Sequence, residues 1–423
     1  MQYNADISHV RRMFRCVVGR WSSRMAVLIK LWDVTESRIM MKSRNKIYLL
    51  MMALVASFLL ASCGIVGGGT TTVKIGLLSP QTGPIAVYAP GFEDAANVAV
   101  SGLNEANDDY VFELIVVDSG CDGTQAATSA QSLIDSGVVG IVGAACSGAT
   151  LGAIAVAAPA GVPMVSYAST SPAISTADDD GYLFRVVPSD AQQSVALADV
   201  VKSMGDSNPA VLFMTNDYGA GLGENFKAAM GSLCTEIGYD PTEGSYDAST
   251  LAQAVVDGGC DSVVLISYAT DGAAIMEELL SQGFSGSLYG ADGLADAALT
   301  QSFTDVAAVD GLVATKPRPG ESSTAKSSFE TAYAAAGGNA EGIYTNETYD
   351  AVNLVAAAVM ADSNDDLRDD LVSLGSSYDG ASGVHTFDSN GDVQGTGYEV
   401  CEFSGANFSC SKIWTSSGGV SGK

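Results

Sequence analysis

Residues 116–150, VVDSGCDGTQAATSAQSLIDSGVVGIVGAACSGAT, decide the fold class of this chain. They begin within an apolar run, 111–117, that predicts a strand ending at Asp118. The stretch then alternates between predicted elements: a helix over 125–134, a strand over 138–142 and a helix over 149–158. Such alternation with short connections is typical of parallel βαβ units, and it argues against a sandwich or a helical bundle.

The same alternation extends to both sides. Further strands are predicted over 73–78, 163–166, 210–214, 262–266 and 287–289, and further helices over 91–107, 222–237, 273–282, 326–336 and 349–361. From Gly383 onward the chain has hairpin character, with Asn390-Gly391 as the predicted turn. Two βα series of similar size predict two doubly wound α/β lobes, whose ligands bind beyond the carboxyl ends of the strands.

Length and charge limit the classes of function. A chain of 423 residues is too long for one ordinary core. The net charge is -28, and the first 62 residues hold half of the 20 Lys and Arg but only three of the 48 Asp and Glu. The strongly acidic remainder repels phosphate backbones and anionic lipids, so we expect no nucleic-acid partner. We interpret the charge as a means of solubility in saline surroundings.

The N-terminal region predicts export. Lys42, Arg44 and Lys46 precede the uncharged run IYLLMMALVASFLL at 47–60, which is shorter than the about 20 residues that a membrane helix needs. A signal-peptide core fits this length better than the alternative, a buried helix. The next residues, LASCG at 60–64, resemble a bacterial lipobox, in which Cys63 would be acylated after cleavage.

We therefore divide the first 71 residues into three segments. Residues 1–40 are expected to be a mis-assigned extension, because Met40 or Met41 is a better start for a signal peptide. Residues 41–62 are the predicted lipoprotein signal peptide, and 63–71 form a flexible glycine-rich tether.

Six cysteines follow Cys63 in the sequence, and they allow fifteen pairings. An exported protein favours disulfides, and we favour pairing between neighbours: Cys121–Cys146, Cys234–Cys260 and Cys401–Cys410. None of the spacings matches the C-x₂₋₄-C pairs of zinc sites, so no metal is predicted.

Catalytic motifs are missing from the sequence. It has no GxxxxGK[ST] loop and no GxSxG elbow, and YGAGLG at 218–223 lacks the spacing of a dinucleotide loop. The two histidines are His9, in the extension, and His385, which we place in the hairpin away from other polar candidates. The run 388–392, DSNGD, hints at calcium but is better interpreted as a turn. We expect no enzymatic activity and no cofactor.

One segment suits an anionic group. AACSGAT at 144–150 lies between a predicted strand and a predicted helix, with Ser147 at the opening of the helix. Backbone N–H groups and a hydroxyl at that position suit a carboxylate. The alternative is an ordinary N-cap serine.

Several further segments, in this order, carry a resemblance to a known family. They are VKIGLLSPQTGPIAVYAPGFEDAANVAV (73–100), GVPMVSYASTSPAIS (161–175), GYLFRVVPSDAQQ (181–193), NDYGAGLGENF (216–226), LYGADGL (288–294), TKPRP (315–319) and ETYDAVNLVAAAV (347–359). Together with the opening stretch, they resemble the periplasmic binding proteins of branched-chain amino acid ABC transporters, the leucine/isoleucine/valine-binding type. The resemblance runs from Val73 to Trp414, and it includes the spacing of Cys121 and Cys146.

The resemblance implies the type I periplasmic binding protein fold: two lobes joined by three crossover strands, with the ligand in the cleft. Lobe 1 would comprise 72–189 and 317–384, and lobe 2 would comprise 190–316 and 385–423. The crossovers would fall near Val187-Pro188, near Lys316-Pro317 and before His385.

The resemblance also implies a set of ligand contacts. Ser147 would hold the α-carboxylate, Thr170 and the backbone of Ala168 would grip carboxylate and ammonium, Tyr218 would close over the ligand, Asp292 would pair with the ammonium, and Tyr88, Tyr268 and Tyr344 would form aromatic walls. A buried zwitterion needs such partners for both charges. Asp292 is one methylene shorter than the glutamate usual in the family, and the tyrosines predict a more polar side-chain pocket.

The predicted function is therefore that of a monomeric, exported, lipid-anchored binding protein. It would bind a branched-chain amino acid or a related small amino-acid or amide solute by hinge closure, and its partners would be the permease and ATPase subunits of an ABC importer. Lipid on Cys63 would be its only membrane contact. The alternative is a sensory lipoprotein of the same fold that relays ligand occupancy to a membrane receptor.

Overall fold

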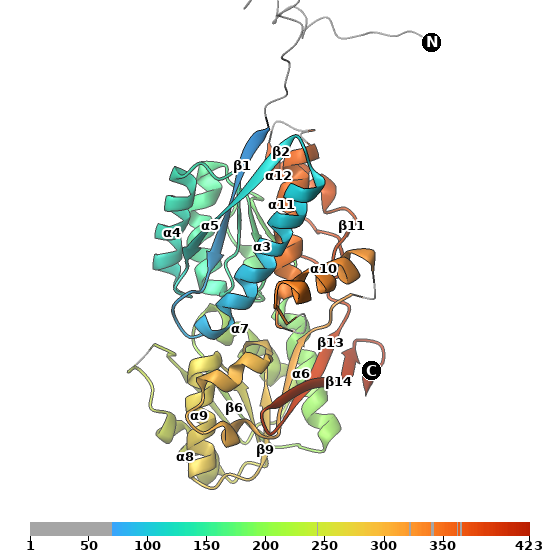
Figure 1. Ribbon diagram of the computed structural model, residues 1–423. Helices are drawn as coiled ribbons and strands as arrows, with labels where there is room; N and C mark the ends of the chain where they lie inside the picture. The colour runs from blue at the N-terminus through green and yellow to red at the C-terminus, as the bar shows by residue number, and fades with distance from the viewer. Residues whose placement is uncertain (1–69, 243, 321–322, 340–341, 362, 364–365) are drawn as a thin grey trace, which may run out of the picture. The chain divides into compact units, whose positions relative to one another are not determined.

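The computed structural model describes residues 70–423 except 243, 321–322, 340–341, 362 and 364–365 (Figure 1). The predicted extension, the signal peptide, Cys63 and most of the tether lie outside the described residues. Thr70–Lys423 form one compact unit. No helix in the described part of this unit combines the length and the apolar character needed to cross a membrane.

A five-stranded parallel sheet is the centre of the first lobe, with the strand order β2-β1-β3-β4-β5. Its strands are β1 (Thr71–Ser79), β2 (Tyr110–Asp118), β3 (Gly140–Val142), β4 (Met164–Ser166) and β5 (Leu183–Arg185). The helices of this lobe are α3 (Ala89–Ala106), α4 (Gly123–Asp135), α5 (Ser147–Ala157), α10 (Thr324–Ala335), α11 (Thr345–Ala361) and α12 (Leu367–Leu374), with short 3₁₀ segments η1 (Ala86–Tyr88), η2 (Ala158–Ala160) and η3 (Ile174–Thr176).

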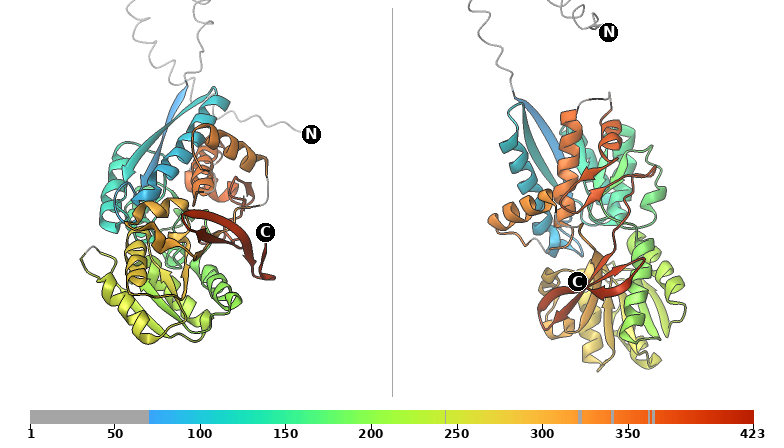
Figure 2. Two further views of the ribbon diagram at one scale, coloured as in Figure 1. Left: turned by 60° about the horizontal axis from the view of Figure 1, so that its bottom comes forward. Right: turned by 90° about the vertical axis from the view of Figure 1, so that its right-hand side faces the viewer.

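Helices cover both faces of this sheet, which is why its strands are apolar runs and do not alternate (Figures 1 and 2). Glycines in the strands allow the helices to approach closely. A Cβ atom at Gly76 would lie 2.8 Å from Leu133 of α4, and one at Gly140 would lie 3.0 Å from Val355 of α11.

The second lobe is built on an eight-stranded sheet with the order β15-β14-β13-β10-β9-β8-β6-β7. Its strands are β6 (Pro209–Met214), β7 (Thr235–Tyr239), β8 (Ser262–Ile266), β9 (Ser287–Gly290), β10 (Leu312–Pro317), β13 (Tyr398–Ser404), β14 (Asn407–Thr415) and β15 (Gly419–Gly422). Its helices are α6 (Asp190–Met204), α7 (Asp217–Met230), α8 (Ala248–Gly258) and α9 (Ala269–Ser281), with 3₁₀ segments η4 (Asp292–Leu294), η5 (Ala297–Ser302) and η6 (Val306–Val309).

Both lobes repeat one strand order. In the second sheet the parallel strands run β7-β6-β8-β9-β10, which matches β2-β1-β3-β4-β5 of the first sheet. In such a sheet the order reverses beside the first strand of the series, and ligands bind there, beyond the carboxyl ends of the strands. The two switch points are therefore between β1 and β3 and between β6 and β8. This arrangement confirms the predicted pair of doubly wound lobes.

The chain passes three times between the lobes: after β5, after β10 and before β13. Around the third passage, β11 (Tyr378–Asp379) pairs with β12 (Val384–His385), and His385 contacts Asp350 of α11 in the first lobe. Asp392 also bonds to Arg185 of the first lobe. We therefore place the third crossover after Asp392, later than the predicted position before His385.

Other local predictions also need correction. Residues 235–237 belong to strand β7, because Gly231 ends α7 with a positive φ of 84°, so the predicted helix over 222–237 is too long. Asn390-Gly391 lies in a turn closed by Asp388, as predicted, but the C-terminal hairpin is β13–β14, whose turn is at Gly405. Elements β5, α6, α8, β10 and α12 escaped prediction because their apolar runs are short or interrupted by polar residues.

The structure contains the three predicted disulfides, Cys121–Cys146, Cys234–Cys260 and Cys401–Cys410. The first joins the loop after β2 to the residue before α5, and therefore fixes the position of Ser147 beside the switch point.

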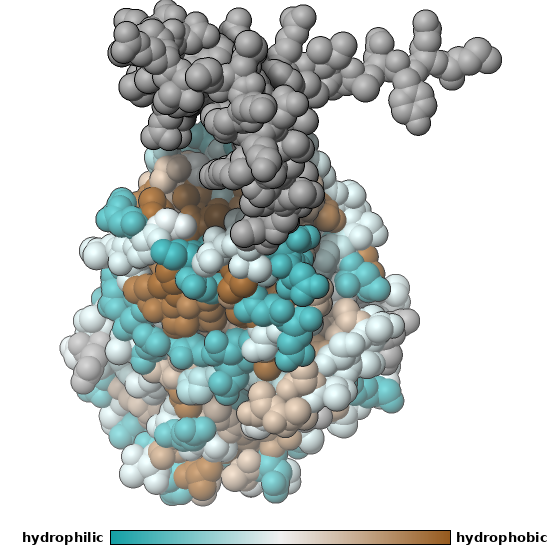
Figure 3. All heavy atoms as spheres, turned by 45° about the horizontal axis from the view of Figure 1, so that its top comes forward, coloured by the Kyte–Doolittle hydropathy of each residue, from teal (hydrophilic) through white to brown (hydrophobic). Residues whose placement is uncertain are grey.

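Large apolar side chains that remain exposed are scattered over the described surface, among them Met204, Leu280 and Val372. The face drawn in Figure 3 shows hydrophobic areas that alternate with polar ones. Scattered exposed apolar residues are ordinary on a soluble protein and do not by themselves define an interface.

Candidate ligand-binding site

A cavity between the lobes lies at both switch points. It contains about 360 Å³ of space not filled by protein atoms, including space open to solvent. Loops that follow β1, β3, β4, β6, β8 and β9 contribute to its wall, together with the start of α3 and the segment before α11. Its lining residues are Ile85, Tyr88, Phe92, Ala145, Ser147, Ala168, Tyr218, Tyr268, Asp292, Gly293, Ile343 and Tyr344.

Seven of the eight predicted ligand residues line this cavity: Tyr88, Ser147, Ala168, Tyr218, Tyr268, Asp292 and Tyr344. The eighth, Thr170, lies behind the wall, with a fully buried hydroxyl. The prediction missed the apolar wall residues Ile85, Phe92 and Ile343. Phe92 was visible only as part of a helical core pattern, and nothing in the sequence pattern distinguished the other two.

Ser147 marks the end of the cavity that suits an anion. It is the first residue of α5, and its side chain does not cap the helix, because the N-cap position belongs to Cys146. Its Oγ instead accepts a hydrogen bond of 3.3 Å from the backbone N–H of Ser171. The N–H groups of the first helical turn and this hydroxyl therefore face the same region, which favours a carboxylate.

Asp292 adds a carboxyl group to the wall of the cavity, which suits a cation. Its Oδ1 accepts a hydrogen bond of 2.7 Å from Tyr218 Oη, and its Oδ2 accepts one of 2.7 Å from Tyr344 Oη. The side chain is almost completely buried. Burial raises the pKa of Asp292, and the bonds from Tyr344 and Tyr218 act in the opposite direction. A cation in the cavity would stabilise the ionised form of this carboxylate.

A second acid near Asp292 escaped the sequence analysis. Asp190 begins α6 and is fully buried, and its backbone N–H bonds to the carbonyl of Thr170. Burial, followed by the charge of Asp292, raises the pKa of Asp190 well above its ordinary value. Asp190 lies in the segment GYLFRVVPSDAQQ, just after a predicted crossover between the lobes, and that position could have pointed to the cleft. Nothing in the pattern, however, distinguished Asp190 from an acid that caps a helix.

Buried acceptors without partners surround this second acid. Both carboxylate oxygens of Asp190, the hydroxyl of Thr170 and Oε1 of Gln193 have no partner at ordinary hydrogen-bond geometry within the described residues, although the Thr170 hydroxyl lies near enough to Asp190 to lower the pKa of that acid. Gln193 is itself fixed by bonds from its Nε2 to Thr315. Leaving such groups unpaired is costly, so their concentration beside Asp292 indicates a site for a ligand that donates hydrogen bonds and carries positive charge.

The aromatic walls are less polar than predicted. Tyr88 Oη donates to the carbonyl of Gly293 at 3.1 Å, and the hydroxyls of Tyr218 and Tyr344 donate to Asp292. The rings of Tyr218 and Tyr268 stack with centroids 5.1 Å apart. Because the hydroxyls of Tyr88, Tyr218 and Tyr344 bond to protein, these rings offer mainly apolar surface to a ligand, as do Ile85, Phe92 and Ile343.

The lobes are in contact across the cleft. Hydrogen bonds between them join Tyr88 to Gly293, Thr270 to Pro84, Ser171 to Asp217, Tyr344 to Asp292 and Ile343 to Asp296. A Cβ atom at Gly148 would lie 2.9 Å from Asp217 Oδ2 across the cleft. This glycine therefore permits the close approach of the two lobes.

The structure corrects the placement of His385. Its Nε2 lies 2.9 Å from Ser382 Oγ and 3.1 Å from Asp350 Oδ2, so polar side chains do lie beside it, contrary to the prediction. The three residues do not form a catalytic triad, because serine and aspartate meet the same ring nitrogen. Asp350 also accepts bonds from the backbone of Ala381 and Ser382, which indicates that the cluster holds this loop against α11.

Asp271 should make the stability of the protein depend on pH. It accepts hydrogen bonds from Tyr239 Oη and from the backbone N–H of Tyr268, and burial raises its pKa from 3.8 to about 7. The unfolded chain ionises Asp271 at lower pH, so its contribution to the free energy of unfolding falls as pH rises from about 4 to about 7, by up to about 4 kcal/mol.

Denaturant unfolding at several pH values checks this expectation. Asp271→Asn keeps an acceptor for Tyr268 and should lose less stability than wild type between about pH 5 and pH 8. Equal slopes for wild type and variant would contradict the assignment.

Comparison with known proteins identifies the family. A sequence model described as "Periplasmic binding protein" matches residues 72–401, well over half of the 423 residues. The chain is a periplasmic binding protein. The family consists of exported solute-binding proteins of transport and not of enzymes, in agreement with the prediction.

Two relatives illustrate the kinship of this binding protein. "Leu/Ile/Val-binding protein homolog 3" of Brucella melitensis is 27% identical over 354 residues, which cover 80% of this chain and 94% of that protein. "Leucine-, isoleucine-, valine-, threonine-, and alanine-binding protein" of Pseudomonas aeruginosa is 25% identical over 340 residues, which cover 78% and 90%. These relatives confirm the predicted resemblance to the branched-chain amino acid group.

Solved structures confirm the type I fold of this binding protein. LivJ from Streptococcus pneumoniae, in complex with isoleucine, has a TM-score of 0.73 at 23% identity and covers 82% of this chain and 100% of its own. A solute-binding protein from R. palustris, in complex with 4-hydroxybenzoate, has a TM-score of 0.69 at 17% identity and covers 78% and 92%.

Proposed function

We propose that this binding protein captures an α-amino acid with an apolar side chain and delivers it to the permease and ATPase of an ABC importer. One observation carries the proposal: a single cavity combines a helix N-terminus with Ser147 at one point and a buried acid, Asp292, at another, and a second buried acid, Asp190, lies near enough to interact with Asp292. An α-amino acid presents a carboxylate and an ammonium group on adjacent atoms, and burying it requires partners for both.

The acids also discriminate between ligand classes found on this fold. An aromatic acid such as 4-hydroxybenzoate carries a carboxylate but no ammonium group. In this cavity it would leave the carboxylate of Asp292 without a counter-charge, and the two negative charges would repel each other. The apolar wall of Ile85, Phe92 and Ile343 then favours an aliphatic side chain, in line with the names of the relatives.

The lipid anchor forms part of the proposal. The lipobox-like LASCG at 60–64 would leave acylated Cys63 as the first residue, tethered to the folded unit by a short glycine-rich segment. A mature N-terminal peptide that starts elsewhere, or that lacks lipid by mass spectrometry, would refute this part alone.

A thermal-shift screen of the purified protein tests the ligand class. Leucine, isoleucine and valine should raise the melting temperature, because a ligand that binds only the folded state stabilises it by mass action. Isovalerate, isoamylamine and 4-hydroxybenzoate are matched controls that lack the ammonium, the carboxylate or both the ammonium and the aliphatic chain. Stabilisation by 4-hydroxybenzoate and not by the amino acids would overturn the proposal.

A further inference from the structure

A second cavity lies behind the first, at the hinge. This hinge pocket contains about 720 Å³ of space not filled by protein atoms, including space open to solvent. Its charged residues are Lys316, Lys326, Glu330, Glu347, Glu399 and Lys423, and Asn346 adds an uncharged amide. Ile343 and Tyr344 line both cavities, so one short segment separates them. Tyr344 has a positive φ of 56° and donates its hydroxyl to Asp292 in the first cavity.

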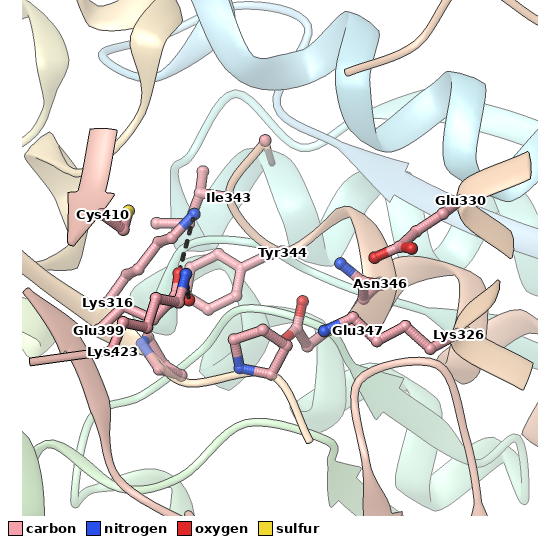
Figure 4. Close-up of a pocket in the computed structure, with 13 residues that line it drawn as sticks. Lys316, Lys326, Glu330, Ile343, Tyr344, Asn346, Glu347, Glu399, Cys410 and Lys423 are labelled. Atoms are coloured by element: carbon pink, nitrogen blue, oxygen red, sulfur yellow. Dashed lines mark ion pairs between the residues drawn. The ribbon is translucent and has the colours of Figure 1, made fainter. Parts of the chain in front are cut away.

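The hinge pocket has walls from both lobes. Lys326 lies on α10 and Asn346 and Glu347 lie on α11, all in the first lobe, whereas Glu399 lies on β13 and Lys423 follows β15 in the second. Figure 4 shows these two groups on opposite sides of the pocket, with Tyr344 between them. A molecule that contacts both groups therefore requires the present arrangement of the lobes.

One side of the hinge pocket offers acceptors. Asn346 is 6% exposed, and its Oδ1 forms no hydrogen bond within the described residues. The neighbouring Glu347 is equally buried, and burial raises its pKa to about 7. A buried amide oxygen beside a buried carboxyl group calls for a ligand that donates hydrogen bonds, and an ammonium group would satisfy both.

The other side offers positive charge. Glu399 accepts from Lys423 Nζ at 2.5 Å and lies 3.7 Å from Lys316 Nζ, so two ammonium groups share one carboxylate. Lys326 is a third lysine, on the first-lobe side of the pocket with Asn346 and Glu347. Ten Lys and Arg residues follow residue 62, and three of them line this pocket together with the acids Glu330, Glu347 and Glu399. Charges of both signs in one pocket suit a ligand that carries both charges.

We propose that the hinge pocket is a second solute site, which takes a small ω-amino acid or similar zwitterion with its ammonium group at Asn346 and Glu347 and its carboxylate toward the lysines. Because both lobes form the site, its ligand stabilises the arrangement in which Tyr344 bonds to Asp292. Occupancy therefore raises affinity in the first cavity. This coupling, unlike the site itself, rests on the proposed function.

Calorimetric titration of the double variant Asp190→Asn, Asp292→Asn with 4-aminobutyrate tests the site, since that variant lacks both buried acids that could pair with an ammonium group at the first cavity. Glycine, β-alanine and 5-aminopentanoate vary the charge separation, and butyrate and butylamine each lack one charge. We expect one ω-amino acid to bind with a stoichiometry of one, and neither control to bind comparably. Adding Glu347→Gln or Lys326→Met should weaken it about tenfold or more.

The outcomes separate the two proposals. Absence of binding by all four amino acids, or binding that Glu347→Gln and Lys326→Met leave unchanged, overturns the hinge site. Binding that these substitutions weaken supports it, even if wild type fails to bind leucine and the proposed function falls. Where leucine does bind wild type, a saturating ω-amino acid should raise its affinity about fivefold or more; unchanged or reduced leucine affinity overturns the coupling.

Discussion

Asp292→Asn is expected to weaken amino-acid binding by about 30-fold to several thousand-fold, a loss of about 2–5 kcal/mol. The substitution keeps the shape of the side chain and one acceptor oxygen, which can serve only one of Tyr218 and Tyr344, and it removes the negative charge from a buried site. The ligand ammonium then remains desolvated without its counter-charge. Isothermal titration with the ligand found in the screen measures the effect.

Asp190 and Ser147 provide graded comparisons. Asp190→Asn should also weaken binding. The losses of binding free energy in the two single variants should not add up in the double variant, because the charge of Asp292 raises the pKa of Asp190 and both acids would face the same ammonium group. Ser147→Ala should cost less, about 1–3 kcal/mol, since backbone N–H groups still face the carboxylate. If Asp292→Asn binds within about threefold of wild type, the ligand carries no ammonium group at this position.

Arg185→Met is expected to lower the free energy of unfolding by about 3–5 kcal/mol, because it leaves the charge of Asp392 in a largely buried position without a partner. The guanidinium is fully buried and makes five hydrogen bonds: Nε and Nη2 to Asp392 at 2.6 and 2.9 Å, Nη2 to Ser175 at 2.7 Å, and Nη1 to the carbonyls of Ser169 and Ser171 at 3.3 and 2.9 Å. All of its N–H donors are therefore satisfied.

The same residue positions the loop around Thr170, beside the cavity between the lobes. Arg185 holds the carbonyls on either side of Thr170, and Ser171 in turn donates its N–H to Ser147 and its hydroxyl to Asp217 of the second lobe. The variant should consequently bind its ligand more weakly as well as unfold more readily.

Urea unfolding monitored by circular dichroism measures the loss of stability. The double variant Arg185→Met, Asp392→Asn is the matched control. It should recover part of the loss because no unpaired charge remains. If the single variant loses less than about 1 kcal/mol, the Arg185–Asp392 pair contributes no more than an ordinary surface salt bridge, and its structural role is refuted.

Much of the fold was predictable from local pattern. Apolar runs and short connections around 116–150 predict parallel strands and helices, and these tendencies are local properties of the chain. The end of α7 was less predictable, since a strand of mixed polarity, β7, follows it after a short loop. The position of the third crossover was not predictable at all, because Asp392 and His385 are held by residues more than thirty positions away.

The sequence by itself determined the fold class, the neighbouring disulfides and seven of the residues that line the ligand cavity, because each depends on short-range patterns or on motifs whose spacing the family shares. Only the tertiary structure decided how polar the cavity is. It showed that three tyrosine hydroxyls bond to the protein, that Asp190 lies buried near Asp292, and that a hinge pocket shares the wall at Tyr344. Those features arise where segments from both lobes meet, and the desolvation that controls their chemistry depends on everything packed around them.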